Sequence, residues 1–255
     1  MEHSTYALDI GGKNSINFVL NCIEKHLEIN SYKNIKVLDI GCGTGQLTQI
    51  IARRYDFEIV GIDIDSKSLD VAKESLKDFP NTRLFLSSIE NFTTQETFDL
   101  IIMTQVLDHI NNPVEVLEKC RKLTNDTGQV IIGISNGYGL YELSKKFFPN
   151  FMRSVLKRSD KLNKLKETPY TFNHDSPHLH HFSIKNIRKI LSKANLTILE
   201  TKKMTFILPA FPFCLLYYFT PDLIANIFEL LDYTIASILP ASCSSNWYIS
   251  CANKW

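Results

Sequence analysis

Short apolar runs alternate with helical patterns along the first two thirds of the chain. Five runs rich in β-branched residues predict strands, and most of them are apolar throughout, as in a sheet covered on both faces. They are Ile35–Ile40, Glu58–Ile62, Arg83–Leu86, Phe98–Met103 and Gln129–Ile134. Apolar positions at three- and four-residue steps predict helices between them, at Gln46–Tyr55, Ser66–Phe79 and Pro113–Leu123. This alternation predicts right-handed crossovers and a mostly parallel α/β sheet with helices on both faces.

Further elements flank this region. The same criteria predict a helix at Lys13–Glu28, a helix at Ser183–Ala194, a strand at Leu196–Lys202, a long apolar helical segment at Phe211–Leu239 and a final strand at Trp247–Ala252. Between Ile134 and the predicted helix at Ser183–Ala194 the apolar periodicity is lost, and an irregular region begins with Gly137-Tyr138-Gly139.

Composition narrows the class of protein. The 255 residues include 28 basic and 27 acidic side chains, and 44% are hydrophobic, which excludes disorder and collagen and gives no overall attraction to nucleic acid. The six cysteines form no CxxC pair, so reduced thiols in a cytoplasmic protein are expected. No signal peptide is recognised, and the apolar run Ile207–Phe219 is shorter than the roughly 20 residues of a membrane-spanning helix.

A glycine-rich turn is the most specific motif. Val37-Leu38-Asp39-Ile40-Gly41-Cys42-Gly43-Thr44-Gly45 joins a predicted strand to a predicted helix, where a ligand can approach the backbone. A plain tight turn is the alternative. A phosphate-binding loop would end in Gly-Lys-Ser/Thr, and a dinucleotide loop would read G-x-G-x-x-G, whereas this loop reads G-x-G-x-G. Asp63 ends the next strand and can accept both hydroxyls of a ribose, while Asp65 better fits a helix cap.

These residues resemble the class I S-adenosylmethionine-dependent methyltransferases. The resemblance rests on Val37–Gly45 with Asp63, the turn Leu86–Glu90, and Phe98–Ile102 leading to Val106-Leu107-Asp108-His109. It is strong over residues 35–135, and the His-Phe-Ser, helix and strand pattern from His181 to Glu200 is similar to the small-molecule branch. The resemblance implies a Rossmann-like sheet of seven strands whose last strand is antiparallel, with S-adenosyl-L-methionine as cofactor and S-adenosyl-L-homocysteine as product.

The resemblance also assigns roles to residues at the strand ends. Asp39 and the loop backbone would face the methionine part of the cofactor. Asp63 and Ile64 would contact the ribose, and Ser88 and Ile89 would border the adenine. The end of the fourth strand would lie beside the sulfonium. The loop residues meant are Gly41, Cys42, Gly43 and Gly45, and those of the fourth strand are Met103, Thr104 and Gln105. Ser88 departs from the family pattern, in which Asp is common at this position, so its contact with the adenine amino group would be weaker.

Methyl transfer to a hydroxyl group calls for a base, and histidines are the candidates. His178 is preferred and His181 comes second, because the segment His174–His181 is expected on a loop over the carboxyl edge of the sheet. A solvated loop or a metal clamp is the alternative. His109 follows the fourth strand, where it is either a base or a packing residue. Gln105–His109 resembles the Glu-x-x-Glu-His metal segment of quinone-precursor O-methyltransferases, but Gln105 replaces the first carboxylate, so no metal is expected.

Two segments suggest what the substrate or partner is. Lys145–Lys166 holds eight basic residues and one acid with apolar side chains interleaved, as in a helix on an anionic membrane, a helix that receives an anionic substrate, or a solvated lid. Met204–Leu239 is rich in Phe, Leu, Ile and Tyr and suits a lipid-linked substrate, peripheral membrane contact or a homodimer interface. A small-molecule acceptor such as a sugar or a quinone precursor also remains open.

Rival functions would require other sequence features. RNA methylation would need an RNA-binding module, and none is visible. Amino-group methylation of bases usually shows Asn/Asp-Pro-Pro-Tyr where Met103-Thr104-Gln105-Val106 stands here. A non-catalytic subunit that binds the cofactor remains an alternative. We expect a single domain over residues 1–255, with a helical cap (1–32), a cofactor-binding core (33–135), a basic and His-rich lid (136–182), and a C-terminal part (183–255) that carries an apolar insertion at 204–240.

Overall fold

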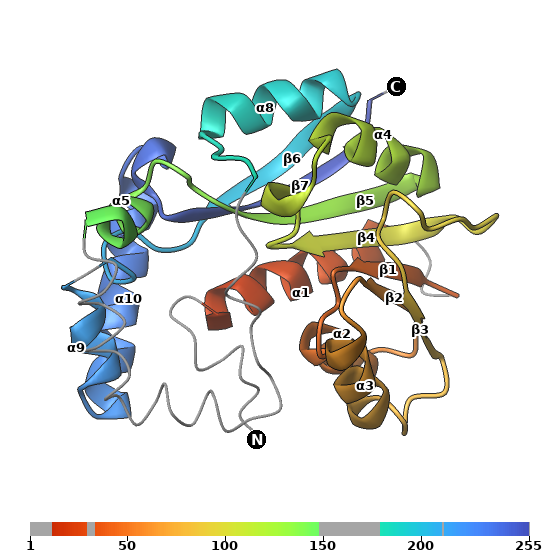
Figure 1. Cartoon of the computed structure of the whole chain (residues 1–255), viewed down its shortest axis with the longest axis horizontal. Helices are drawn as coiled ribbons and strands as arrows, with labels where there is room; N and C mark the ends of the chain where they lie inside the picture. The colour runs from red at the N-terminus through yellow and green to blue at the C-terminus, as the bar shows by residue number, and fades with distance from the viewer. Residues whose placement is uncertain (1–11, 30–33, 148–178, 211, 255) are drawn as a thin grey trace.

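The computed structural model describes residues 12–29, 34–147, 179–210 and 212–254. Seven strands form one sheet in the order β3-β2-β1-β4-β5-β7-β6 (Figure 1). The first five strands are parallel, and β7 runs antiparallel to both β5 and β6. The strands are β1 (Lys36–Ile40), β2 (Glu58–Asp63), β3 (Thr82–Leu86), β4 (Phe98–Thr104), β5 (Thr124–Ser135), β6 (Leu196–Lys203) and β7 (Asn246–Asn253). The predicted fold class, including the antiparallel last strand, is confirmed.

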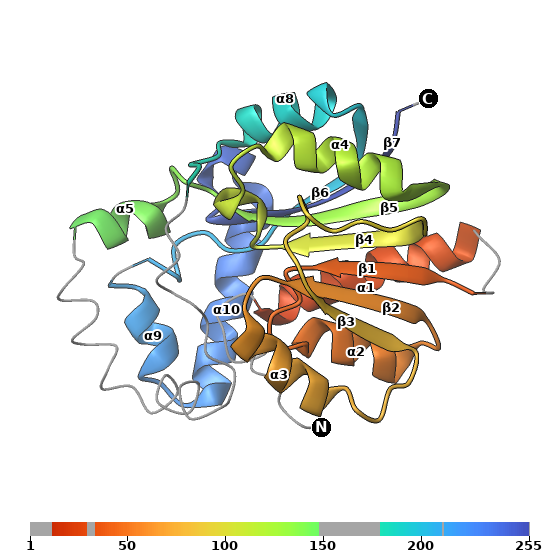
Figure 2. The ribbon, with the colours of Figure 1, turned by 45° about the vertical axis from the view of Figure 1, so that its right-hand side comes forward.

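Helices cover both faces of this sheet. On one face, α1 and α2 bury apolar side chains against β1 and β4, and on the other α4 and α8 pack against β4, β5 and β7. Figure 2 shows α3 on the same side as α2. The helix bounds are α1 (Gly12–Ile29), α2 (Gln46–Arg54), α3 (Ser66–Ser75), α4 (Pro113–Leu123), α5 (Leu140–Phe147), α8 (Ile184–Lys193), α9 (Cys214–Tyr218) and α10 (Asp222–Ile238), with short 3₁₀ turns η2 (Leu107–His109) and η3 (Ala241–Cys243).

Three expectations about element bounds differ from the structure. The helix expected through Phe79 ends at Ser75. The single apolar helix expected at Phe211–Leu239 is two helices, because the extended backbone of Pro221 (φ −54°, ψ 151°) separates α9 from α10. The strand expected to begin at Gln129 begins at Thr124, and its pairing with β4 shifts register between Phe98 and Leu100.

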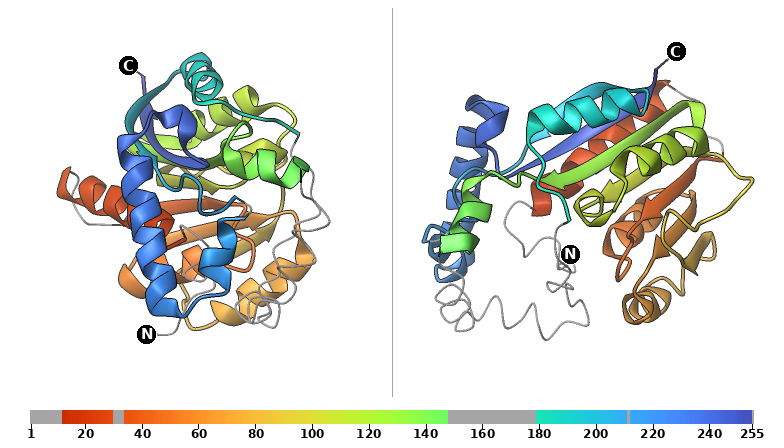
Figure 3. Two further views of the ribbon diagram at one scale, coloured as in Figure 1. Left: turned by 90° about the vertical axis from the view of Figure 1, so that its left-hand side faces the viewer. Right: turned by 45° about the horizontal axis from the view of Figure 1, so that its top comes forward.

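Three helices gather beyond the carboxyl ends of the parallel strands. They are α5, α9 and α10, which lie at the left of Figure 1; α9 and α10 pack against each other, and the left view of Figure 3 shows α5 apart from α10. None of the described helices is both long enough and apolar enough to cross a bilayer. The carboxyl edge of the sheet and these three helices therefore face one another on the same side of the molecule.

Candidate functional site

The glycine loop after β1 has a backbone that side chains would disrupt. Gly41 has φ +71°, its amide donates to the carbonyl of Ile62 at 2.8 Å, and a Cβ there would lie 2.3 Å from Cγ2 of Val106. Gly43 has φ +52°, and a Cβ there would meet no atom of the described chain within 4 Å. Gly41 is thus required for packing against the end of β4, whereas the space above Gly43 is open for a ligand.

Asp63 at the end of β2 is joined to this loop. Its Oδ2 accepts the amide of Gly43 at 2.7 Å, and its Oδ1 accepts the amide of Asp65 at 2.9 Å. Asp65 caps α3, as predicted, because its carboxylate accepts the amides of Lys67 and Ser68. The two carboxylates therefore have different tasks, and only that of Asp63 adjoins the glycine loop.

Asp39 is buried in β1 beneath the loop. The hydroxyl of Thr48 in α2 donates to its Oδ2 at 2.6 Å. Burial, opposed by the Thr48 hydrogen bond and assisted by the nearby charge of Asp63, raises the pKa of Asp39 from 3.8 to about 6. Two carboxylates beside one glycine loop repel a phosphate and favour a ligand that carries positive charge.

The ends of the neighbouring strands complete this edge of the sheet. The carboxyl ends of β2 and β3 adjoin, because the amide of Ser87 donates to the carbonyl of Asp63 at 2.9 Å. Ile64, which follows Asp63 directly, is 75% exposed. Ser88 is half-buried and its hydroxyl accepts the amide of Asn91 at 3.3 Å, while Ile89 is buried in the core. Residues predicted to bind one ligand are thus brought together at β1, β2 and β3.

The end of β4 contributes a strained residue. Met103 is fully buried in the core and Thr104 is buried, so their side chains belong to the sheet. Gln105 is exposed and has φ +56°, a left-handed conformation that costs energy for a residue other than glycine. Its amide donates to the carbonyl of Gly133 at 2.8 Å, and its Oε1 accepts the hydroxyl of Ser135 at 2.8 Å. These bonds hold Gln105 at the edge next to the glycine loop.

Asp108 and His109 form a pair directly after β4. Nε2 of His109 lies 3.8 Å from Oδ1 of Asp108, the Asp108 side chain is buried, and the His109 ring is partly exposed. The imidazole of His109 therefore lies beside a carboxylate that can orient it. His109 thus has the chemistry of a base beside the end of β4.

The end of the His-rich segment is fixed to the same edge. The amides of Leu179 and His180 donate to the carbonyl of Asp108 at 2.8 and 3.1 Å, and Nε2 of His180 lies 3.2 Å from the carbonyl of Asn111. His181 is exposed, and a Cβ on Gly137 would lie 2.6 Å from its Cα, so the loop after β5 packs closely against it.

These bonds place His180 and His181 over the carboxyl edge of the sheet, between the loops that follow β4 and β5. His174 and His178, the preferred base, lie outside the described residues.

Two residues at this edge were missed by the sequence analysis. Asn136 is buried, and its Nδ2 donates to the carbonyls of Ser242 and Ser244 at 2.9 and 2.7 Å, which joins the end of β5 to the segment before β7. Its Oδ1 accepts the amide of Tyr138, whose side chain is 62% exposed. The Gly-Tyr-Gly sequence was the available signal, because two glycines around an exposed aromatic ring mark a loop that can contact a ligand.

The cysteine thiols do not suit nucleophilic chemistry. All six are free, and burial raises the pKa of Cys22 to about 11 and of Cys120 and Cys251 to about 12. Burial also raises the pKa of Cys42 in the glycine loop. Cys42 therefore serves the loop through its backbone, whose amide donates to the carbonyl of Ile62 at 3.1 Å.

Comparison with known proteins decides the family. The family model of the methyltransferase domain matches residues 31–195, which is more than half of the chain. The chain belongs to the methyltransferase domain family. A solved S-adenosylmethionine-dependent methyltransferase from Clostridium acetobutylicum has the same fold, with a TM-score of 0.60 at 15% identity over 97% of this chain and 93% of that one. N-methyltransferase NodS from Bradyrhizobium japonicum, solved with S-adenosyl-L-homocysteine, gives 0.56 at 14% identity over 95% and 87%.

Curated relatives of this methyltransferase domain are O-methyltransferases. The malonyl-[acyl-carrier protein] O-methyltransferase 1 of Ilyobacter polytropus is 28% identical over 57% of this chain and 56% of its own length. The ubiquinone biosynthesis O-methyltransferase of Pelagibacter ubique is 31% identical over 48% and 52%. The chain thus spans about half the length of these relatives.

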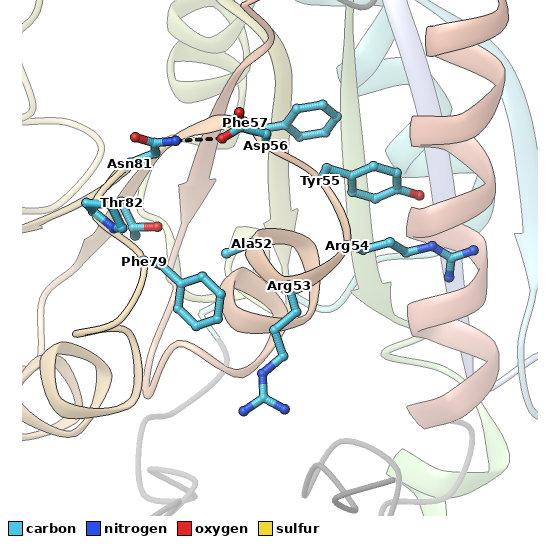
Figure 4. Close-up of a pocket in the computed structure, with 10 residues that line it drawn as sticks. Ala52, Arg53, Arg54, Tyr55, Asp56, Phe57, Phe79, Asn81 and Thr82 are labelled. Atoms are coloured by element: carbon cyan, nitrogen blue, oxygen red, sulfur yellow. Dashed lines mark hydrogen bonds between the residues drawn. The ribbon is translucent and has the colours of Figure 1, made fainter.

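Two further features of the methyltransferase domain lie outside this constellation. Among the described residues, no three His, Cys, Asp or Glu side chains gather as metal ligands. A pocket of about 400 Å³ lies at the opposite edge of the sheet, between the end of α2 and the starts of β2 and β3 (Figure 4). Its wall includes Arg53 and Phe79, and Asn81 donates to Asp56 at 2.7 Å beside it. This pocket is therefore not part of the site at the carboxyl edge.

Proposed function

We propose that the protein transfers a methyl group from S-adenosyl-L-methionine to a hydroxyl group of a small or lipid-linked molecule. The observation that carries the proposal is the pair of hydrogen bonds from Leu179 and His180 to the carbonyl of Asp108, which brings histidines to the edge where Gln105 ends β4. Imidazole titrates near neutral pH, so such a ring can take the proton that a hydroxyl loses.

The residues at the carboxyl edge fit the cofactor. The open space above Gly43 suits a ligand that lies on the backbone, and the carboxylates of Asp39 and Asp63 suit a ligand with a sulfonium and an ammonium group. Asp63 would hold the ribose with the acceptor capacity that its two amide bonds leave, and exposed Ile64 would contact the adenosine. When bound, S-adenosyl-L-methionine supplies a methyl group on sulfur and is released as S-adenosyl-L-homocysteine.

The acceptor hydroxyl would lie beside Gln105, Tyr138 and the histidines. As its oxygen forms the bond to the methyl carbon, the bond from that carbon to sulfur breaks and the hydroxyl proton passes to an imidazole nitrogen. His178 and His181 are the proposed bases from the His-rich segment, and His109 is the third candidate because it follows the end of β4 and lies beside Asp108. Gln105 would orient the acceptor rather than take the proton.

The names of two relatives support an acceptor that is methylated on oxygen. Two relatives act, by their names, on a malonyl group attached to acyl-carrier protein and in ubiquinone biosynthesis, and both are O-methyltransferases. A sugar, a quinone precursor or a similar metabolite, free or linked to a lipid, is consistent with them. A subunit that binds the cofactor without turnover is the competing function, since the same glycine loop would serve it.

Transfer of an isotope-labelled methyl group to a metabolite extract tests the proposal. We expect a labelled product whose mass rises by one methyl group and whose carbon is bonded to oxygen, as shown by mass spectrometry and NMR. A methyl group found on nitrogen or carbon would overturn the hydroxyl assignment. Cofactor binding by calorimetry without transfer to any metabolite would favour the non-catalytic subunit.

A further inference from the structure

The surface formed by α9 and α10 has an unusual distribution of side chains. The buried positions of α10 are small or acidic, namely Ala225, Glu229, Asp232 and Ala236, and the partly buried Phe228 and Tyr233 pack against the core beside them. Asp232 accepts three backbone amides, those of Phe206, Ile207 and Leu208, at 2.8 to 2.9 Å. The polar groups of this helix are thus used inside, where they hold the segment that follows β6.

The outward positions of α10 are apolar. An exposed row of side chains runs along the full helix, about 25 Å for its 17 residues. Its members are Leu223, Ile227, Leu230, Leu231 and Ile238, and Leu216 and Phe219 of α9 extend it. We call these seven side chains the apolar face. Asp222 is the only charged residue from 212 to 240 that is exposed, so the face has almost no charge of its own. An apolar area of this kind on a soluble fold marks a binding surface.

Lysines from other elements contact α10 along its length. Nζ of Lys13 in α1 lies 3.3 Å from Oδ1 of Asn226, and Nζ of Lys203 in β6 donates to the carbonyls of Ser237 and Leu239 at 2.6 Å. Lys202 lies over the ring of Tyr233 at 5.6 Å. The apolar face is therefore accompanied by positive charge at both its amino-terminal half and its carboxyl-terminal end.

The basic segment of the sequence begins on the same side of the molecule. Lys145 and Lys146 are on α5, which, like α9 and α10, lies beyond the carboxyl ends of the parallel strands (Figure 1). The chain from Lys145 to Lys166 carries eight basic residues against one acid. A partner that fits the apolar face and the lysines at α10 (Lys13, Lys202 and Lys203) is apolar at its centre and negatively charged beside it, which is the chemistry of an anionic bilayer surface.

We propose that the apolar face binds the surface of a bilayer that contains anionic lipids. The side chains of Leu223, Leu230 and their neighbours enter the boundary between headgroups and acyl chains, and the lysines contact the headgroups. Because α9 and α10 lie beyond the carboxyl ends of the parallel strands, the bilayer would be at the same edge of the sheet as the candidate site. A second copy of the chain fits the apolar face less well than an anionic bilayer, because pairing two copies would bring their lysines close together around the apolar centre.

Co-sedimentation with vesicles tests this inference. We expect the full chain to sediment with phosphatidylcholine vesicles that contain about one third phosphatidylglycerol, to bind phosphatidylcholine alone at least tenfold more weakly, and to lose most binding in high salt. Equal binding to both vesicles, or none to either, would overturn the proposal. No methyl transfer is measured, so failure here would leave the proposed function standing.

A pair of matched variants identifies the surface. Leu223→Gln/Leu230→Gln should weaken binding to the anionic vesicles by about tenfold or more, because two side chains that enter the bilayer become polar. The control Ile29→Gln/Leu199→Gln changes equally exposed apolar residues on α1 and β6 and should bind as the parent does. Equal binding by both double variants would contradict the inference. The apolar face would instead belong to a dimer interface if light scattering showed a dimer, the α10 substitutions converted it to a monomer, and no vesicle binding was found.

Discussion

The amide of Gly43 donates a 2.7 Å hydrogen bond to Oδ2 of Asp63, and this bond joins the loop after β1 to the end of β2. The two strands adjoin in the sheet, and the strand order reverses between β1 and its other neighbour, β4. Parallel α/β sheets bind ligands at such a reversal, beyond the carboxyl ends of the strands. The bond therefore fixes the shape of the loop at the place where the cofactor is expected.

Replacing Asp63 should lower cofactor affinity, whereas replacing its neighbour Asp65 should lower only the stability of the fold. We expect Asp63→Ala to weaken affinity for S-adenosyl-L-homocysteine by roughly 10- to 100-fold, because charge-assisted hydrogen bonds to the ribose and to the loop are lost. Asp65→Ala is the control, since it removes the cap of α3 and should cost about 1 kcal/mol of stability while leaving affinity nearly unchanged. Calorimetry measures both. Unchanged affinity in Asp63→Ala, or preference of the parent for NAD, would refute the assignment.

Two glycines of the loop should respond differently to alanine. Gly43→Ala should cost only about 1 kcal/mol of stability, from its positive φ, but its methyl group would occupy the ligand space and lower cofactor affinity more than about tenfold. Gly41→Ala should destabilise the fold by about 2 kcal/mol or more, because its Cβ would overlap Val106. Urea unfolding and calorimetry together distinguish the two. Full affinity in a folded Gly43→Ala protein would place the ligand elsewhere.

The raised pKa of Asp39 predicts a pH dependence with a definite sign. Its pKa is about 6 in the folded chain against 3.8 ordinarily, so the folded state holds the proton more tightly. This group's contribution to stability is therefore highest below pH 4, is lost as the pH rises through 6, and costs about 3 kcal/mol above that. Asp39→Asn should be more stable than the parent at pH 7.5, by a margin about 1 kcal/mol larger than at pH 5.

Cofactor affinity should show the opposite dependence on Asp39. A positively charged ligand favours the ionised carboxylate, so the parent should bind more tightly at pH 7 than at pH 5, by up to about tenfold, while Asp39→Asn should bind weakly at both pH values. Calorimetry at the two pH values measures this. An Asp39→Asn variant that is stabilised and also binds as the parent does would show that Asp39 has no contact with the cofactor.

Most of the fold could be predicted because the signals were local. The bounds of Pro113–Leu123 were exact, since Asn112 caps the helix and Pro113 suits its first position. The break between α9 and α10 was missed because apolar periodicity continues across Pro221, and the outward direction of the α10 apolar side chains depends on the buried Asp232, which pairs with a distant segment. Contacts between segments remote in sequence leave no such periodic signal.

The candidate site was predictable to the same extent. The glycine loop, Asp39 and Asp63 share one strand-helix-strand unit, so their spacing indicated their proximity. The hydrogen bonds from Asn136 to the carbonyls of Ser242 and Ser244 could not be predicted, because these residues are more than a hundred positions away in the sequence. The bonds from Leu179 and His180 to Asp108 are equally non-local, although the sequence did place the His-rich segment at this edge.

Turnover should not depend on a metal ion. Gln105 offers a neutral oxygen that already accepts the hydroxyl of Ser135, so the segment Gln105–His109 lacks the first charged ligand of a divalent cation. We expect full activity in excess EDTA. Activity that disappears in the chelator and returns with Mg²⁺ would show that Asp108 and His109 bind a metal, and Gln105→Glu would then be expected to tighten the metal requirement.

Replacement of the histidines should identify the base. A hydroxyl must lose its proton as the methyl group arrives, so His178→Ala or His181→Ala should lower kcat, by roughly 100-fold for the true base, and leave cofactor affinity nearly unchanged. The control is His180→Ala, because the ring of His180 already lies 3.2 Å from the carbonyl of Asn111 and should serve the loop rather than the acceptor. If both variants keep full activity on the identified acceptor, His109 becomes the remaining candidate. His109→Ala should then lower kcat while leaving cofactor affinity nearly unchanged.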